Sequence, residues 1–194
     1  MTGFFNEAYR GLPPWDVGHP QAEFVQLASE GKIQGKVLDV GCGTGENAIF
    51  FAGLGLDVLG LDEAPLAIEK AKKKAALKRS SASFVVGDAL KLGELGRKFD
   101  TITDSGLFHV FSDEERRVFQ ESLKSALKSG GTYFMLCFSD KEPAGWGGPR
   151  RVSEMEIRDT FRDGWEVDWI REAKFESTFH EEGGHAWLTS VTLL

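Results

Sequence analysis

Three glycines at alternate positions, Gly41, Gly43 and Gly45, follow directly after the largely apolar run 37–40. Such a run is typical of a buried parallel strand, and the stretch 46–52 predicts a helix. Glycines between a strand and a helix allow dihedral angles that a Cβ would forbid, and they let a ligand lie against the backbone. The first N–H groups of the helix point towards that ligand. This stretch therefore predicts an α/β fold with a ligand site at the turn.

Acidic residues stand at the ends of the predicted strands. Asp39 lies just before the glycines, whose Gly-x-Gly-x-Gly spacing departs from the dinucleotide-binding fingerprint. Asp62 follows the apolar run 57–61, where an α/β nucleotide-binding fold presents the tip of its second strand, and Asp88 follows the run 83–86. Strand tips of a doubly wound sheet meet at one edge. We therefore expect an adenosine ligand, with its ribose at Asp62 and its adenine amine at Asp88.

These motifs resemble those of class I S-adenosylmethionine-dependent methyltransferases, and the resemblance clearly covers residues 36–138. It implies S-adenosylmethionine as the cofactor, S-adenosylhomocysteine as the product, and no metal. Asp104 and Ser105 match the segment that lines the methyl-transfer site. The cofactor-binding residues implied by the resemblance are Asp39, Gly41, Gly43, Gly45, Asp62, Asp88, Ala89 and Asp104.

A narrower resemblance involves two segments outside the sheet. Pro14-Trp15-Asp16 and the stretch 147–153 look like parts of thiopurine, halide and thiol methyltransferases. The stretch 104–111 resembles small bacterial enzymes that methylate heterocyclic compounds, hydroxyquinolones among them. The resemblance implies that residues 1–22 close over the cofactor and that residues 139–152 form a lid loop. Trp15 is the expected cation–π partner of the sulfonium.

The expected reaction is in-line displacement of the methyl group, with a small, partly aromatic acceptor attacking through S, O or N. His109 is a candidate general base, because its ordinary pKa lies near neutrality, and Asp104 is a second candidate catalytic residue. A histidine that only bonds the backbone remains an alternative, and an acidic acceptor needs no base. Aromatic or cationic contacts to the acceptor are expected from Phe108, Trp146, Arg150 and Arg151.

Alternating strand and helix patterns predict a Rossmann-like, doubly wound sheet of seven strands, mostly parallel, with a C-terminal antiparallel hairpin. The predicted strands are 37–40, 57–61, 83–86, 99–103, 132–138, 165–177 and 185–193. Capping boxes predict helices that begin after Ser112 and after Ser153. Gly130-Gly131 is expected to end the first of these helices, and residues 1–22 are expected to be irregular.

The chain has 194 residues and a net charge of −7, which suits one domain, 1–194, and disfavours attraction to nucleic acid. It shows neither a leader pattern nor an apolar run long enough to span a membrane, so cytoplasm is the expected location. Two alternatives to methyl transfer remain at this point. One is a nicotinamide-dependent oxidoreductase, which the glycine spacing disfavours, and the other is a non-catalytic module that binds S-adenosylmethionine. The oligomeric state is open.

Overall fold

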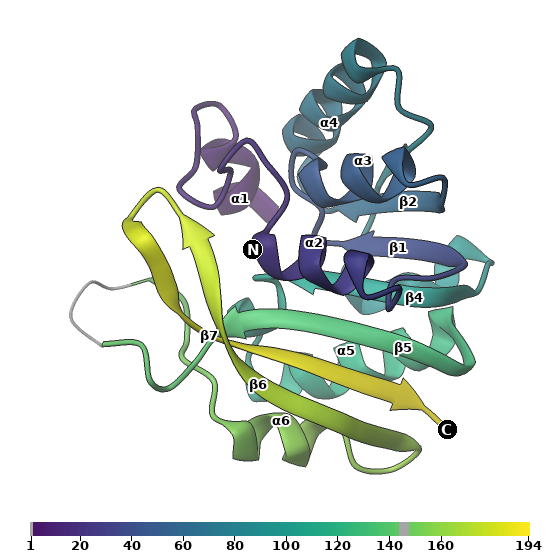
Figure 1. The fold of residues 1–194 in the computed structure, drawn as a ribbon, viewed down its shortest axis with the longest axis vertical. Coiled ribbons are helices and arrows are strands. Elements are labelled where there is room, and N and C mark those ends of the chain that lie inside the picture. The colour runs from purple at the N-terminus through teal and green to yellow at the C-terminus, as the bar shows by residue number, and fades with distance from the viewer. Residues whose placement is uncertain (1, 144–147) are drawn as a thin grey trace.

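The computed structural model describes residues 2–143 and 148–194, and it places seven strands in one sheet of order β3-β2-β1-β4-β5-β7-β6 (Figure 1). The strands are β1 (Lys36–Val40), β2 (Asp57–Asp62), β3 (Ser83–Val86), β4 (Phe99–Ser105), β5 (Leu127–Phe138), β6 (Trp165–Ser177) and β7 (His180–Leu193). The α-helices are α1 (Thr2–Ala8), α2 (Ala22–Ser29), α3 (Glu46–Gly53), α4 (Pro65–Lys78), α5 (Asp113–Ala126) and α6 (Glu154–Thr160). Two 3₁₀ helices, η1 (Ala89–Leu95) and η2 (Phe108–Val110), complete the described elements.

Strands β1 to β5 run parallel, and β7 lies antiparallel between β5 and β6. The predicted mostly parallel sheet with a C-terminal hairpin is confirmed. The strand order reverses at β1, which pairs with β2 on one side and with β4 on the other. In open α/β sheets ligands bind beyond the carboxyl ends of the strands at such a switch point. The turn after β1 and the turn after β4 therefore flank the expected site.

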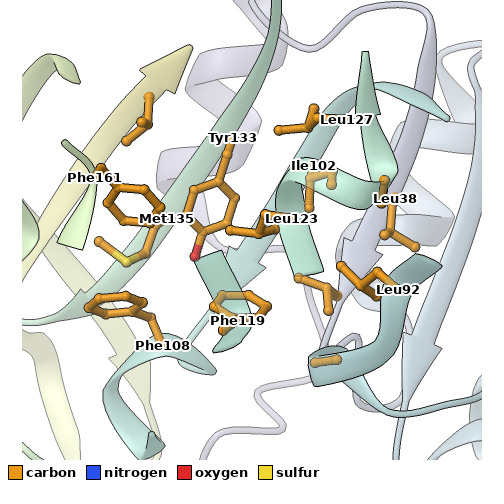
Figure 2. Packing of buried hydrophobic residues seen from close by; sticks show 14 of the residues in the cluster. Leu38, Leu92, Ile102, Phe108, Phe119, Leu123, Leu127, Tyr133, Met135 and Phe161 are labelled. Atoms are coloured by element: carbon orange, nitrogen blue, oxygen red, sulfur yellow. The ribbon is translucent and has the colours of Figure 1, made fainter. Parts of the chain in front are cut away.

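Two helical layers cover the two faces of the sheet, because side chains alternate along each strand. Leu38 of β1 and Tyr133 of β5 pack with η1, α5 and α6, and Figure 2 shows this layer. Val37 and Phe134, one position away, pack with α2, α3 and α4. Burying each large apolar side chain of this kind contributes roughly 1.5–3 kcal/mol relative to exposure. Both layers hold the strand tips in fixed positions.

Two expectations from the sequence are wrong. Residues 2–8 form a helix rather than an irregular segment, since the prolines that suggested irregular structure all come later, and Phe5 packs against Trp15 with ring centroids 5.8 Å apart. A helix this short depends on such tertiary contacts. Gly130-Gly131 does not end α5, which stops at Ala126. The two glycines lie within β5 where its register to β4 shifts, and Gly130 has φ +76°, as bulges often require.

The N-terminal segment crosses the molecule from α4 to the hairpin. The backbone N–H of Leu66 donates to Asn6 Oδ1 at 3.0 Å, and the N–H of Thr178 donates to the carbonyl of Pro14 at 2.9 Å. Figure 1 shows α1 close to the tip of the β6–β7 hairpin. Within the described ranges, every helix is too short or too polar to cross a membrane.

Candidate active site

The glycine turn brings the backbone of residues 41–45 against several other elements. Gly41, Gly43 and Gly45 all have positive φ values, of 69°, 54° and 85°, which non-glycine residues rarely adopt. A Cβ on Gly41 would lie 3.1 Å from Leu107, and a Cβ on Gly43 would lie 2.7 Å from the hydroxyl of Tyr9. Side chains larger than a hydrogen atom at these positions would therefore clash with the residues that pack against the turn.

Asp62 is tied to this turn from the tip of β2. Its Oδ2 accepts the N–H of Gly43 at 2.9 Å, and its Oδ1 accepts the N–H of Ala64 at 2.8 Å. Burial raises the pKa of this carboxyl, although both hydrogen bonds oppose that rise. Each carboxylate oxygen has a further lone pair, and Asp62 lines the cavity described below. The geometry thus leaves acceptor capacity for ligand hydroxyls.

Asp39 and Asp104 lie inside the fold and do not line the cavity. Asp39 accepts the hydroxyl of Thr103 at 2.9 Å, and Asp104 accepts the N–H of Leu107 at 2.7 Å and the hydroxyl of Tyr133 at 2.7 Å. Burial raises the pKa of each carboxyl to about 7. Asp39 thus ties β1 to β4 and Asp104 holds the turn after β4, so the structure places both behind the site rather than in it.

The tip of β3 also reaches the cavity. Asp88 is exposed, and its Oδ1 accepts the N–H of Leu90 at 2.9 Å, which caps η1. Ala89 is buried, and its carbonyl accepts the hydroxyl of Ser122 at 2.7 Å. Asp88, Ala89 and Leu90 line the same cavity as Gly41 and Asp62. The structure therefore brings the expected ribose and adenine positions together.

The N-terminal segment covers the glycine turn with two rings. The indole N–H of Trp15 donates to the hydroxyl of Tyr9 at 2.9 Å, and both residues line the cavity. The hydroxyl of Thr44, in the turn itself, donates to Asp16 at 2.8 Å, which fixes the segment over the turn. Sequence reasoning singled out Trp15 but did not assign Tyr9 any role. Its approach to Gly43 depends on a contact between residues far apart in the chain.

His109 lies in η2 with its ring packed against a pair of phenylalanines that also contact each other. The ring stacks on Phe138 with centroids 5.3 Å apart and an interplanar angle of 10°, and it lies 5.8 Å from Phe175. The backbone N–H of Phe138 donates to Nδ1 of His109 at 3.2 Å. Burial, together with the positive charges of Arg116 and Arg151, lowers the pKa of His109 to about 3. The imidazole is therefore neutral, and sequence reasoning missed both phenylalanines that hold it.

The residues expected in the lid fall into different environments. Phe108 is fully buried and stacks on Phe161 at 5.9 Å, so it belongs to the core shown in Figure 2. Arg150 lines the cavity and is paired with Asp113 at 2.5 Å and with Glu156. Arg151 donates to the carbonyls of Pro149 and Pro143 at 2.9 and 3.0 Å. Trp146 lies outside the described residues.

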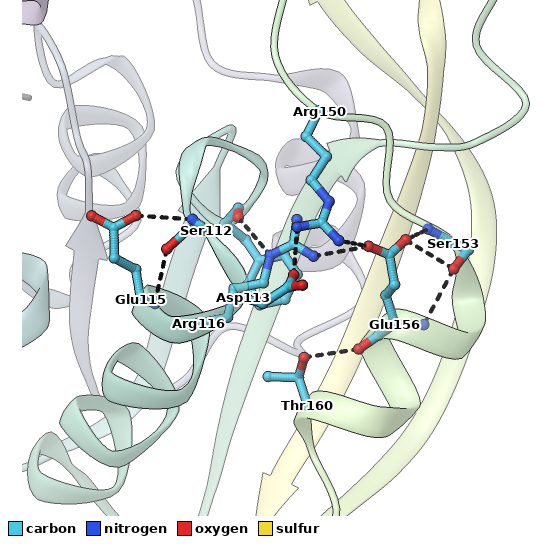
Figure 3. Close-up of polar contacts among 9 residues, drawn as sticks. Ser112, Asp113, Glu115, Arg116, Arg150, Ser153, Glu156 and Thr160 are labelled. Carbon is cyan, nitrogen blue, oxygen red and sulfur yellow. Dashed lines mark hydrogen bonds and ion pairs between the residues drawn. The ribbon is translucent and has the colours of Figure 1, made fainter.

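Glu156 connects the lid loop to the helices beneath it, as Figure 3 shows. It accepts from Arg150, from Arg116 at 3.2 Å and from the N–H of Ser153 at 2.8 Å. Arg116 is only 3% exposed, and its guanidinium lies 4.4 Å from the centroid of the Phe108 ring. The Glu156 carboxylate thus neutralises the buried Arg116 and also anchors Arg150, which lines the cavity.

A cavity of about 1100 Å³ joins these parts. Gly41, Asp62 and Asp88 line it on the side of β1 to β3, while His109, Phe138 and Phe175 line it on the side of β5 and the hairpin. Its volume is slightly above the roughly 300–1,000 Å³ of sites for a single small ligand, so it has room for two small molecules. In the described part of the chain, no three His, Cys, Asp or Glu side chains are grouped as metal ligands.

The described residues fit an S-adenosyl compound. Gly41 exposes backbone to the cavity, the Asp62 oxygens suit ribose hydroxyls, and Asp88 and Ala89 lie where an adenine edge would be, whereas Gly43 and Gly45 pack against Tyr9 and Phe84 and do not line the cavity. The aromatic rings of Tyr9 and Trp15, which line the same cavity, suit a cationic sulfonium.

Comparison with known proteins agrees with this fit. A family model described as a methyltransferase domain matches residues 37–131. The chain is 38% identical over 184 residues to 2-heptyl-1-hydroxyquinolin-4(1H)-one methyltransferase of Mycobacteroides abscessus. This match covers 90% of this chain and 81% of that protein. It is 32% identical over 148 residues to a probable thiol methyltransferase 2 of Arabidopsis thaliana, covering 75% of this chain and 65% of the other.

Solved structures show the same relationship. The structure reported for conversion of a disulfide bond into a thioacetal group during echinomycin biosynthesis has a TM-score of 0.90 and 36% identity, and it covers all of this chain and 91% of that one. Magnesium protoporphyrin IX methyltransferase from Synechocystis PCC 6803, with bound S-adenosylmethionine, shares the fold at a TM-score of 0.68 and 22% identity, over 89% and 77% of the two chains. Neither alternative from the sequence, an oxidoreductase or a non-catalytic module, has support here. The chain belongs to the S-adenosylmethionine-dependent methyltransferases that act on small molecules.

Proposed function

We propose that the chain transfers the methyl group to an oxygen or sulfur atom on a small aromatic heterocycle. The observation that carries this proposal is the wall made by Phe138 and Phe175, whose ring centroids are 4.8 Å apart, with His109 stacked against it. Flat apolar surfaces of this kind suit a planar acceptor. The name of one relative gives a hydroxyquinolone as its acceptor, and the name of the other gives a thiol.

The acceptor is proposed to carry an apolar substituent. Phe4 and Phe179 both line the cavity, yet they are 70% and 66% exposed. Large exposed apolar side chains gathered at a cavity commonly mark a surface that a ligand covers. An alkyl chain that extends from the heterocycle towards these two residues would cover them.

In this site the chain's own residues bind and orient the cofactor and the acceptor. When bound, S-adenosylmethionine supplies a methyl group that the sulfonium has already activated. Asp62 and Asp88 hold the adenosine, the glycine turn faces the amino-acid tail, and Tyr9 and Trp15 cover the sulfonium and exclude water. We propose that residues 1–22 and 139–152 act as lids over the two halves of the cavity. Holding both reactants in line supplies part of the roughly 7–11 kcal/mol that alignment can contribute.

The test is a methyl-transfer assay with a panel of acceptors, in which formation of S-adenosylhomocysteine and of each methylated product is measured by mass spectrometry. The panel contains 1-hydroxyquinolin-4-ones with and without a heptyl chain, and an aromatic thiol. We expect turnover of a heterocyclic hydroxyl or thiol, and a lower KM with the alkyl chain. Phe179→Ser should raise KM for the alkylated compound only, whereas the matched change Met155→Ser, at an exposed residue of α6 that does not line the cavity, should leave it unchanged. Absence of turnover across the panel would refute the proposed acceptor class.

The proposed reaction needs no metal, because the electrophile is activated before it binds. Dialysis against EDTA should leave the rate unchanged. A loss that added Mg²⁺ or Zn²⁺ restores would show that a metal takes part.

A further inference from the structure

The environment of His109 fixes which of its ring nitrogens carries the hydrogen. Nδ1 faces the backbone N–H of Phe138 at 3.2 Å, and this N–H is buried between β5 and η2. Two N–H groups cannot bond to each other, and leaving a buried N–H unpaired is costly. Nδ1 therefore holds the lone pair. In a neutral ring the hydrogen must then be on Nε2.

The Nε2 atom lies at the wall of the cavity. It is 3.3 Å from the position that a Cβ of Gly106 would occupy, and both His109 and Gly106 line the cavity. Gly106 has φ +81° and a Cβ there would also lie 2.8 Å from Phe175, so only glycine lets the rings of Phe175 and His109 lie this close to the backbone. Within the described chain, Nε2 has no hydrogen-bond partner of its own.

A general base needs a free lone pair facing the acceptor, and the Nε2–H tautomer presents a hydrogen there instead. Protonation of Nδ1 would break its bond with Phe138 and bury a cation. The charged groups around the ring are Arg116 of α5 and Arg151 of the loop before α6, and both disfavour a further positive charge on the ring. The ring therefore stays neutral in the pH range where such enzymes work.

Resting on the proposed function, we propose that His109 is a fixed hydrogen-bond donor, through Nε2–H, to an acceptor atom that is already ionised. The site would thus select acidic hydroxyls or thiols rather than deprotonate weakly acidic ones. The acceptor loses its proton to solvent before transfer. A lone pair of the resulting anion forms the bond to the methyl carbon, and the electrons of the broken carbon–sulfur bond remain on the sulfur as a neutral thioether. His109 gives up no proton and takes none.

The first test reads the tautomer without any turnover. Long-range ¹H–¹⁵N NMR of the full chain with bound S-adenosylhomocysteine should show His109 with a bare Nδ1 and a protonated Nε2. Neither signal should titrate between pH 5 and 8. A protonated Nδ1 with a bare Nε2, or a ring that titrates near neutrality, would overturn the assignment whatever the enzyme's acceptor is.

The second test measures acceptor binding by calorimetry to the complex with S-adenosylhomocysteine. Affinity for 1-hydroxyquinolin-4-one should follow the compound's own ionisation and exceed that for its O-methyl ether. His109→Phe keeps the ring stacking and removes the donor, so affinity for the anion should fall about 10- to 100-fold, while His109→Gln, whose amide can donate, should recover much of it. Binding of S-adenosylhomocysteine should be the same in all three proteins, which shows that they are folded.

The outcomes separate the two proposals. If the wild type binds S-adenosylhomocysteine but no hydroxylated or thiol acceptor, the proposed function fails. If the acceptor binds and is methylated but His109→Phe binds the anion as tightly as the wild type, the donor role fails and the function stands. A rate that rises with a histidine-like pKa for acceptors of every acidity would show that His109 is a base after all.

Discussion

The hydroxyl of Tyr9 lies 2.7 Å from the position that a Cβ of Gly43 would occupy. This contact joins the N-terminal segment to the turn after β1, and the same hydroxyl accepts the indole N–H of Trp15. The N-terminal segment and the glycine turn therefore form one packed unit. A methyl group at Gly43 cannot be added without displacing the tyrosine.

Gly43→Ala should destabilise the protein by about 1–2 kcal/mol through its left-handed dihedral alone, and by more through the clash with Tyr9. Adding Tyr9→Phe leaves the nearest remaining ring atom at 3.7 Å, so the second change should restore the part due to the clash. Gly55→Ala is the control, because Gly55 has φ +88° with no atom within 4 Å. Urea denaturation of the four proteins of the cycle measures the coupling. Purely additive effects would mean that Tyr9 does not restrict Gly43.

Asp62→Ala should weaken binding of S-adenosylhomocysteine by roughly 1.5–3 kcal/mol, the range for hydrogen bonds to a charged group. The substitution also removes the acceptor of the Gly43 N–H, so the turn itself becomes less ordered. Glu63→Gln is the matched control at the next position, since Glu63 lines the cavity as well. Calorimetry gives both dissociation constants. Equal constants for Asp62→Ala and the wild type would contradict the assignment of the ribose to Asp62.

Glu156→Gln should lower the free energy of unfolding by about 3 kcal/mol or more, because it leaves the buried guanidinium of Arg116 without its counter-ion. Glu154→Gln, in the first turn of the same helix, changes an exposed pair with Arg158 at 3.8 Å and should cost less than about 1 kcal/mol. Urea denaturation compares the two variants. Similar, small losses would show that Glu156 does not stabilise this cluster.

The free energy of unfolding should decrease as the pH rises from about 4 to 7, relative to Asp39→Asn. Burial raises the pKa of Asp39 from its ordinary value of 3.8 to about 7, so the folded protein binds more protons than the unfolded chain in this range. The expected slope approaches about 1.4 kcal/mol per pH unit, and asparagine retains an acceptor for Thr103. Urea denaturation of both proteins at pH 5 and pH 7 should show their difference change by roughly 1–3 kcal/mol. A constant difference would show that Asp39 titrates normally.

The sequence predicted the positions at strand tips because these follow from local patterns. An apolar run followed by glycine or aspartate gives the tips at Gly41, Asp62 and Asp88, and parallel topology brings such tips together. The capping boxes at Ser112 and Ser153 are local as well, and both are present.

Contacts between distant parts of the chain could not be predicted in this way. The tautomer of His109 depends on the backbone N–H of Phe138, and its ring position depends on Phe175 at the far end of the hairpin. Phe108 lies next to His109 in sequence but points into the core, because the short 3₁₀ turn η2 sends neighbouring side chains in different directions. Local motifs locate the site, whereas tertiary packing decides which neighbour enters it.

The central claim is that one cavity holds the cofactor and the acceptor side by side. A crystal structure with S-adenosylhomocysteine and a 2-alkyl-1-hydroxyquinolin-4-one tests it most directly. We predict the ribose hydroxyls on Asp62, the heterocycle against Phe138 and Phe175, and its oxygen within hydrogen-bond distance of His109 Nε2. Density for the acceptor outside this cavity, for example in the smaller pocket lined by Thr101 and Trp169, would contradict the account.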